Sequence, residues 1–353
     1  MIEANKELRW IRILLIIITL PVVVIILKAL KMIFIPLIFA IFLSFVFAPL
    51  TAFLKKRHIP LWLILLITLV IIACFFSLIV LIVYAASNSL ITGLPRYQLR
   101  FEQLMVDGTT LFTDLAKRMA IATESIPLFD LNQLFSAGSV SIPKIIGNTM
   151  NTFMVIAWNF FLILVFMIFI LLEADKLQAR LKKVMSHSSK QQTLETLSSI
   201  QQQIQNYLTV KTLISLATAL VGMMLMLAFG VDFVLVCGIL LFVMNFIPNI
   251  GSVIASAIPI IIVVLQTGFD IRLVMFSSLI VATQMLFGNI LEPRFQGNKL
   301  NLTPIMVLVS LIFWGWLWGF VGMLICVPLT SGINIILKQM DPDSLISALI
   351  SGE

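Results

Sequence analysis

Ionisable side chains are rare in the apolar parts of this sequence, and the first candidates for chemistry are Glu292 and Arg294. They flank Pro293 in the stretch FGNILEPRFQG, residues 287–297. Because a proline disfavours helix at the residue before it, we expect the preceding helix to end at Glu292. A carboxylate at a helix C-terminus opposes the helix dipole, and Arg294 is the nearest group that could compensate it.

Two interpretations of this acidic and basic pair remain open. It is either an ion pair at the cytoplasmic membrane boundary or a gating or coupling pair beside a solute path. The second interpretation has a physical basis, since ionisable groups at membrane depth are costly and usually functional.

A second set of candidates consists of amides, a hydroxyl and turn residues within apolar surroundings. Amides and hydroxyls suit a small, neutral, hydroxyl-rich solute, because they both donate and accept hydrogen bonds. The candidates for a substrate path are Asn245, Pro248, Asn249, Gly251, Ser252, Gln284, Asn289 and Asn301.

The sequence offers no catalytic or metal-binding constellation. Cys74, Cys237 and Cys326 lie in apolar stretches without a CxxC spacing, and neither HExxH nor GxSxG occurs. We therefore predict no enzyme activity, no metal and no cofactor. The net charge of +7 fits basic loops on the cytoplasmic side of a membrane better than nucleic-acid binding.

The elements that must position these residues are membrane helices. The 353 residues are 61% hydrophobic and only 11% charged, and the mean hydropathy is +1.13. The apolar runs are continuous, as in residues 61–86, whereas strands of a membrane barrel alternate apolar and polar residues. We predict an all-α polytopic protein with about eight membrane segments, an external helical region and a cytoplasmic connector helix.

The expected order along the chain follows from the apolar runs and the basic loops. Basic residues near the N-terminus, at 55–58 and at 173–184 place both termini in the cytoplasm. The first two membrane segments are expected at 11–28 and 32–54. The predicted parts are three N-terminal membrane helices in 1–86, an external helical region in 87–147, a fourth membrane helix in 148–172, a cytoplasmic amphipathic connector in 173–211, a C-terminal transport block in 212–340 and a tail in 341–353.

Two interrupted hairpins are predicted in the C-terminal block. The first has arms at 233–247 and 253–267, with Ser252 expected to cap the second arm. The second has arms at 302–314 and 323–338, because a straight helix over 303–337 would be about 52 Å long, too long for one span. Whether the hairpins cross the membrane or re-enter is open. The residues assigned to the second break are Gly315, Gly319, Gly322 and Pro328.

Such breaks matter because interrupted helices are the best sequence indication of a transporter's binding site. A broken helix exposes N–H and C=O groups that can hold a polar solute where protein or water shields them from lipid. Ordinary interfacial turns and an aromatic belt are the alternative interpretations.

The motifs NFIPNIGSVIA, FGNILEPRFQG and LIFWGWLWGFVGMLICVPLT together resemble the autoinducer-2 exporter family of bacterial permeases. The resemblance is strongest over residues 205–330, and the overall layout fits from end to end. It implies a multi-pass transporter of the bacterial inner membrane that assembles as a homo-oligomer, with a pentamer expected. It implies export of autoinducer-2 for some members and sodium or lithium/proton antiport for others.

Three functions are therefore considered. Export of a small polar metabolite such as autoinducer-2 suits the amide-rich, charge-poor C-terminal block. Monovalent cation/proton antiport would need a protonatable carboxylate at depth, and Glu292 is the candidate. A non-transporting membrane scaffold ranks last, because it does not need two interrupted hairpins.

Overall fold

All regular elements in the described part of the chain are helices. The computed structural model describes residues 15, 18–19, 21–78, 80–81, 100, 103, 106, 154–173, 187–296 and 302–340. The predicted external region and C-terminal tail thus lie almost entirely outside the described residues. The N-terminal part contains a helix at Pro21–Ala29, α2 at Lys31–Val46, α3 at Ala48–Lys56, and helices at Leu61–Leu78 and Met154–Glu173.

The C-terminal part contains the elements of both predicted hairpins. They are α7 (His187–Ala228), α8 (Val234–Met244), α9 (Ile250–Thr267), α10 (Ile271–Gln284), the π-helix η1 (Met285–Leu291), α11 (Glu292–Gln296), α12 (Pro304–Trp318) and α13 (Phe320–Met340). Within the described residues, six helices are long and apolar enough to span a membrane, or up to seven if a bent pair counts as one span. The all-helical polytopic prediction is confirmed, although the count of eight segments is not fixed.

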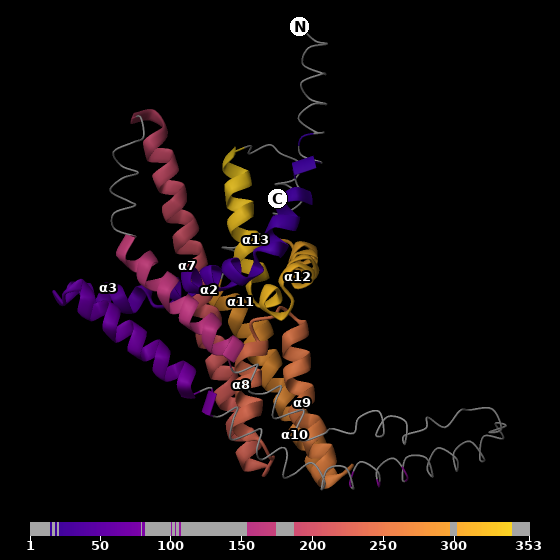
Figure 1. The fold of residues 1–353 in the computed structure, drawn as a ribbon. Helices are drawn as coiled ribbons and strands as arrows, with labels where there is room; N and C mark the ends of the chain where they lie inside the picture. Colours follow the sequence, from indigo (N-terminus) through magenta and orange to yellow (C-terminus); the bar gives the residue numbers. More distant parts are fainter. Residues whose placement is uncertain are drawn as a thin grey trace, which may run out of the picture.

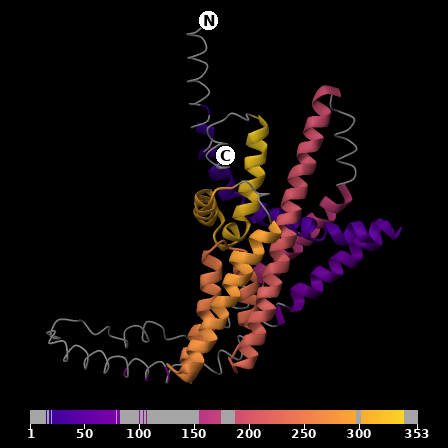
Figure 2. The same cartoon turned by 180° about the vertical axis from the view of Figure 1, so that it is seen from behind.

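The 42-residue helix α7 organises this part. It runs the length of the molecule in both views, with α8, α9 and α10 grouped beside its lower half and α12 and α13 beside its upper half (Figures 1 and 2). Its apolar stretch Gln201–Ala228 is one of the candidate spans. The boundary predicted at residue 211 between connector and membrane block therefore falls inside one continuous helix.

The first two predicted membrane segments form a bent pair. The helices Pro21–Ala29 and Lys31–Val46 meet at an angle of 85°, the geometry of a broken span or a re-entrant loop. Two separate spans at 11–28 and 32–54 stay a prediction, because part of the first segment lies outside the described residues. In the figures α2 crosses the long helix α7 (Figures 1 and 2). The bend occurs at Leu30, the one residue between the two helices, because its backbone angles (φ −91°, ψ 18°) are not those of an α-helix.

Both C-terminal hairpins exist, but the first break is shifted by three residues toward the N-terminus and the second is shorter than predicted. The first lies between Met244 and Ile250, so that Gly251 and Ser252 belong to α9. The second is confined to Gly319, with Gly315 inside α12 and Gly322 inside α13.

Four prolines in the apolar segments lie within helices and do not end them. Pro328 lies inside α13, Pro259 inside α9 and Pro36 inside α2, so Pro328 is not part of a break. Pro293 follows the π-helix, in which the Glu292 N–H bonds to the Phe287 carbonyl. The expectation that this helix ends at Glu292 is wrong, because the changed hydrogen-bond spacing carries it past Pro293 to Gln296.

The two hairpins are closed in the same way. Each break contains one residue with positive φ, Asn249 (57°) and Gly319 (65°), which reverses the chain. A glycine then follows in the first turn of the second arm. A Cβ at Gly251 would overlap the Met244 carbonyl, and a Cβ at Gly322 would overlap the Trp314 carbonyl. These glycines allow the backbones of the two arms to touch.

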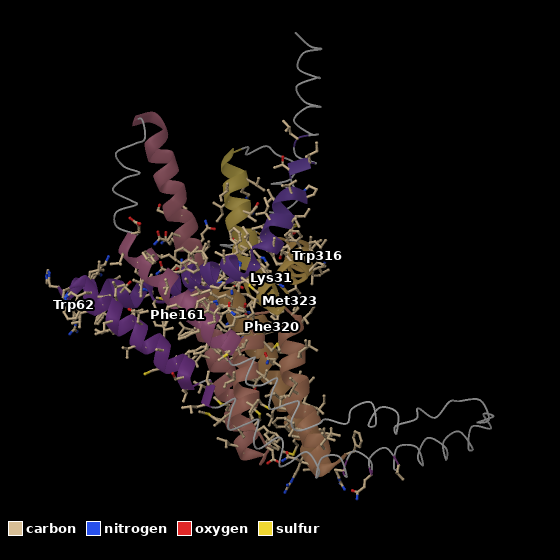
Figure 3. All side chains as sticks on the ribbon, viewed as in Figure 1. Lys31, Trp62, Phe161, Trp316, Phe320 and Met323 are labelled. Carbon is tan, nitrogen blue, oxygen red and sulfur yellow. The ribbon has the colours of Figure 1, made fainter. Side chains whose placement is uncertain are left out.

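The second hairpin packs on the N-terminal helices. Trp318 donates from its indole nitrogen to the Leu27 carbonyl oxygen (3.1 Å), and Trp314 donates to the Thr330 hydroxyl (3.1 Å). Trp316 is exposed and lies under the Lys28 ammonium, 4.4 Å from the ring centroid. Trp316, Phe320 and Met323 lie around the α12–α13 turn, far from Trp62 (Figure 3).

We predict that Gly322→Ala lowers the Tm of the detergent-solubilised protein by at least about 3 °C, because an added methyl group collides with backbone and such overpacking costs about 1–3 kcal/mol. The matched control is Gly288→Ala, since a Cβ at Gly288 meets no atom within 4 Å. A thermal-unfolding scan of both variants makes the test. Equal Tm values for the two would contradict the account of the hairpin closure.

Candidate functional site

The centre of the candidate site is an ion pair between α7 and α11. The Lys211 ammonium lies 2.6 Å from the Glu292 carboxylate, and the two side chains are only 6% and 15% exposed. Gln296, one turn after Glu292, donates from its amide nitrogen to the same carboxylate oxygen (3.0 Å). Both charged residues lie within candidate membrane spans.

Glu292 is paired with Lys211 and not with Arg294, the nearest group in the sequence that could compensate it. Arg294 is exposed, whereas the carboxylate is held by Lys211 from a helix 81 positions away in sequence. Lys211 itself was missed, because it was assigned to the end of a connector. A signal was available: Ile204, Leu208, Lys211 and Ser215 recur at helical spacing on one face of α7, so Lys211 continues the buried stripe.

Polar side chains continue along this stripe of α7. Tyr207 lies one turn before Lys211, while Ser215 and Thr218 follow it, and all three are buried. The Asn245 amide nitrogen donates to the Ser215 hydroxyl (3.1 Å). Asn245 is the C-cap residue of α8, so the first helix break is attached to α7 one turn from the ion pair.

This contact fixes where the break lies along the membrane helix. Ser215 is near the middle of the apolar stretch Gln201–Ala228, about 20 Å from either end at 1.5 Å per residue. The break from Asn245 to Asn249 therefore meets α7 near the centre of its span. Asp232 and Asp270, by contrast, lie in the turns that precede α8 and α10, as expected for segment ends.

Side chains of the second hairpin complete the surroundings of the pair. Ile247 from the first break packs in one core cluster with Tyr207, Trp314 and Cys326. Thr330, Ser331 and Asn334 are buried on α13, and α13 packs directly on α7. The two hairpins and the ion pair therefore meet around one section of α7.

The other residues predicted for a substrate path are placed unevenly. Gln284 is buried at the end of α10, immediately before the π-helix. Asn249 and Asn289 are exposed, and Asn301 lies outside the described residues. Pro248 is in the break and partly buried. Ser252 does not cap α9 through its oxygen; its hydroxyl donates to the Asn249 carbonyl (2.9 Å).

The π-helix was also missed by sequence analysis. It spans Met285–Leu291, between Gln284 and Glu292. Short π-helical turns are frequent at functional sites. Here the wider turn keeps Gln284, Gly288 and Glu292, which are spaced four residues apart, toward one side of the helix. No simple sequence pattern predicts a π-helix.

A polytopic helical bundle with an interrupted hairpin and a buried ion pair between two candidate membrane spans is typical of a membrane transport protein. The family model described as AI-2E family transporter matches residues 13–341. The chain belongs to this family.

Several relatives are similar over most of their length. The AI-2 transport protein TqsA of Escherichia coli K12 is 33% identical over 325 residues, which cover 90% of this chain and 89% of the relative. A putative transport protein of Haemophilus influenzae is 29% identical over 94% of both chains. A putative transport protein of Borreliella burgdorferi is 30% identical over 92% of this chain and 86% of the relative.

We predict that Lys211→Met and Glu292→Gln each lower the free energy of unfolding by about 3–5 kcal/mol, because either change leaves a buried charge without its partner. The double variant Lys211→Met/Glu292→Gln removes both charges and should recover most of the loss. Chemical unfolding of the four proteins in detergent completes this double-mutant cycle.

The control for this cycle is Arg294→Gln, which changes an exposed charge two residues from Glu292 and should alter stability by less than about 0.5 kcal/mol. Additive losses in the double variant would mean that Lys211 and Glu292 do not stabilise each other.

Proposed function

We propose that this protein exports a small, neutral, polar metabolite such as autoinducer-2 across the bacterial inner membrane. The observation that carries the choice of solute is the likeness to the AI-2 transport protein TqsA over nine-tenths of the chain. The polar groups around α7 are compatible with it, because the paired charges Lys211 and Glu292 cancel and leave amides and hydroxyls as hydrogen-bonding groups.

The proposed setting follows from the basic loops and the resemblance of the motifs. Both termini are cytoplasmic, the protein is a homo-oligomer, and a pentamer is the expected state. In this orientation α7 enters the membrane from the cytoplasm, and the turns that contain Asp232 and Asp270 face the periplasm.

The role proposed for the ion pair is gating of the path. Lys211 and Glu292 join α7 to α11 beside the first break, so that separating the charges would free the two helices to move apart. A solute with hydroxyl groups could then reach the amide and backbone groups of the break.

We predict that inverted membrane vesicles containing this protein take up labelled autoinducer-2 faster than vesicles without it. The double variant Lys211→Met/Glu292→Gln, which removes the contact that gates the path, should change the rate at least about tenfold, which corresponds to about 1.4 kcal/mol. Uptake equal to that of empty vesicles by the unmodified protein would reject the proposed solute. An unchanged rate in the double variant would limit the ion pair to a structural role.

Monovalent cation/proton antiport is the second candidate, favoured by the burial of Glu292 within a membrane span. It predicts that a sodium or lithium gradient drives proton movement in proteoliposomes and that Glu292→Gln abolishes it. A pH-sensitive dye inside the liposomes measures this movement, with Arg294→Gln as the control. Absence of cation-dependent proton movement in the unmodified protein would exclude this function.

A further inference from the structure

The α10–η1–α11 helix leaves open space at Gly288, one turn from the ion pair. A Cβ added at Gly288 would meet no atom within 4 Å, although this residue is only partly exposed. Gly288 lies one turn from Glu292, on the side of the helix that includes the buried Gln284. Space for a small group is therefore present next to charged and polar side chains.

Two contacts fix the register between α7 and the α10–η1–α11 helix. Lys211 bonds to Glu292 at one end, and a Cβ at Gly222 would lie 3.5 Å from Ile280 at the other. Both helices advance by about three turns between these contacts. The antiparallel register therefore sets Gln284 near the level of Thr218 and Gly288 near the level of Ser215.

Gln284 is the second, independent indication of a ligand. The residue is only 8% exposed, and its amide nitrogen and amide oxygen are both buried without a hydrogen-bond partner among the described residues. Buried polar groups are nearly always satisfied, and an unsatisfied one in a native protein needs an explanation. An amide offers two donors and an acceptor, which matches a ligand that carries hydroxyl groups.

The remaining groups around this space limit the charge of the ligand. Lys211 and Glu292 neutralise each other at 2.6 Å, so the site has no net charge with which to hold a free cation or anion. Ser215 accepts a hydrogen bond from Asn245, and a hydroxyl that accepts one bond still has a proton to donate. The chemistry favours a neutral solute with several hydroxyl or carbonyl oxygens.

We infer that Gln284, Ser215 and the space at Gly288 form the binding site for a small neutral polyhydroxylated solute when α7 and the π-helix move apart. This inference rests on the proposed transport function and names the site that serves it. The Gln284 amide binds the solute's oxygens, and the absence of a side chain at Gly288 provides the room. The ion pair closes the end of the site toward Gln296.

The first test separates a binding role of Gln284 from a structural one. Gln284→Met keeps the size of the side chain and removes the unsatisfied amide, so Tm should stay equal or rise, while KM for autoinducer-2 uptake by inverted vesicles rises at least about tenfold. The same substitution at Gln266, whose amide oxygen accepts the Asp232 N–H, is the control and should leave KM unchanged. A lower Tm with an unchanged KM for Gln284→Met would overturn the inference.

The second test fills the space. Gly288→Leu should reduce uptake at least about tenfold while Tm stays within about 2 °C of the unmodified protein, because the leucine occupies room that no protein atom uses. Gly288→Ala, which fills less of the space, should have a smaller effect. Unchanged uptake by Gly288→Leu would overturn the inference.

The third test does not depend on the identity of the solute. Gly288→Cys should react with a charged, membrane-impermeant thiol reagent faster than Ala282→Cys, because Ala282 is exposed near the middle of the same apolar candidate span. The unmodified protein with its three native cysteines gives the background. Equal, slow reaction of both cysteines would overturn the inference.

The outcomes distinguish the site from the proposed solute. Reaction at Gly288→Cys without autoinducer-2 uptake by the unmodified protein supports a polar site and rejects the solute. Autoinducer-2 uptake that is insensitive to both Gln284→Met and Gly288→Leu supports the proposed function and rejects this site.

Discussion

The ion pair between Lys211 and Glu292 constrains the whole C-terminal bundle. Two charges within apolar helices are tolerated only when they are paired and hydrogen-bonded, and Gln296 adds such a bond. Because the pair joins α7, the longest helix among the described residues, to the helix that follows the first hairpin, it fixes the antiparallel register of these two helices. Asn245 attaches the first hairpin to α7 one turn from Lys211, so the first hairpin lies beside the ion pair.

The two hairpins are variations of one construction around this pair. Each reverses at a residue with positive φ, and each brings the backbones of its arms together at a glycine. The first hairpin packs on α7 and α10, and the second on α7 and the N-terminal helices. Their contacts meet where Ile247 packs among the residues of the second hairpin. A movement that separated Lys211 from Glu292 would therefore act on both hairpins.

Composition and local pattern were sufficient to predict the helical membrane fold and the two hairpins. Continuous apolar runs require helices in lipid, and the length of residues 303–337 requires a reversal, which occurs at Gly319. The extent of each break could not be predicted, since it depends on where the arms touch. Pro293 wrongly suggested a helix end. The expectation that a proline ends a helix assumes α-helical hydrogen bonds, and the π-helix that precedes Pro293 does not have them.

The site was only half predictable from the sequence. Glu292 is conspicuous because it is a carboxylate beside long apolar runs. Its partner is far away in sequence, and only the fold decides between Lys211 and the adjacent Arg294. Gln284 was among the predicted residues, but its significance lies in its unsatisfied amide and in the open space at Gly288, which are properties of packing rather than of pattern.

We expect the first helix break and the ion pair to lie inside the membrane rather than at its surface. An electron cryomicroscopy structure in lipid nanodiscs would measure the distance from the Cα atom of Asn245 to the bilayer midplane. The account predicts a distance below about 15 Å, within the hydrocarbon core of about 30 Å, with Lys211 and Glu292 in contact or separated beside it. A break located among the lipid headgroups or in bulk solvent would contradict the account.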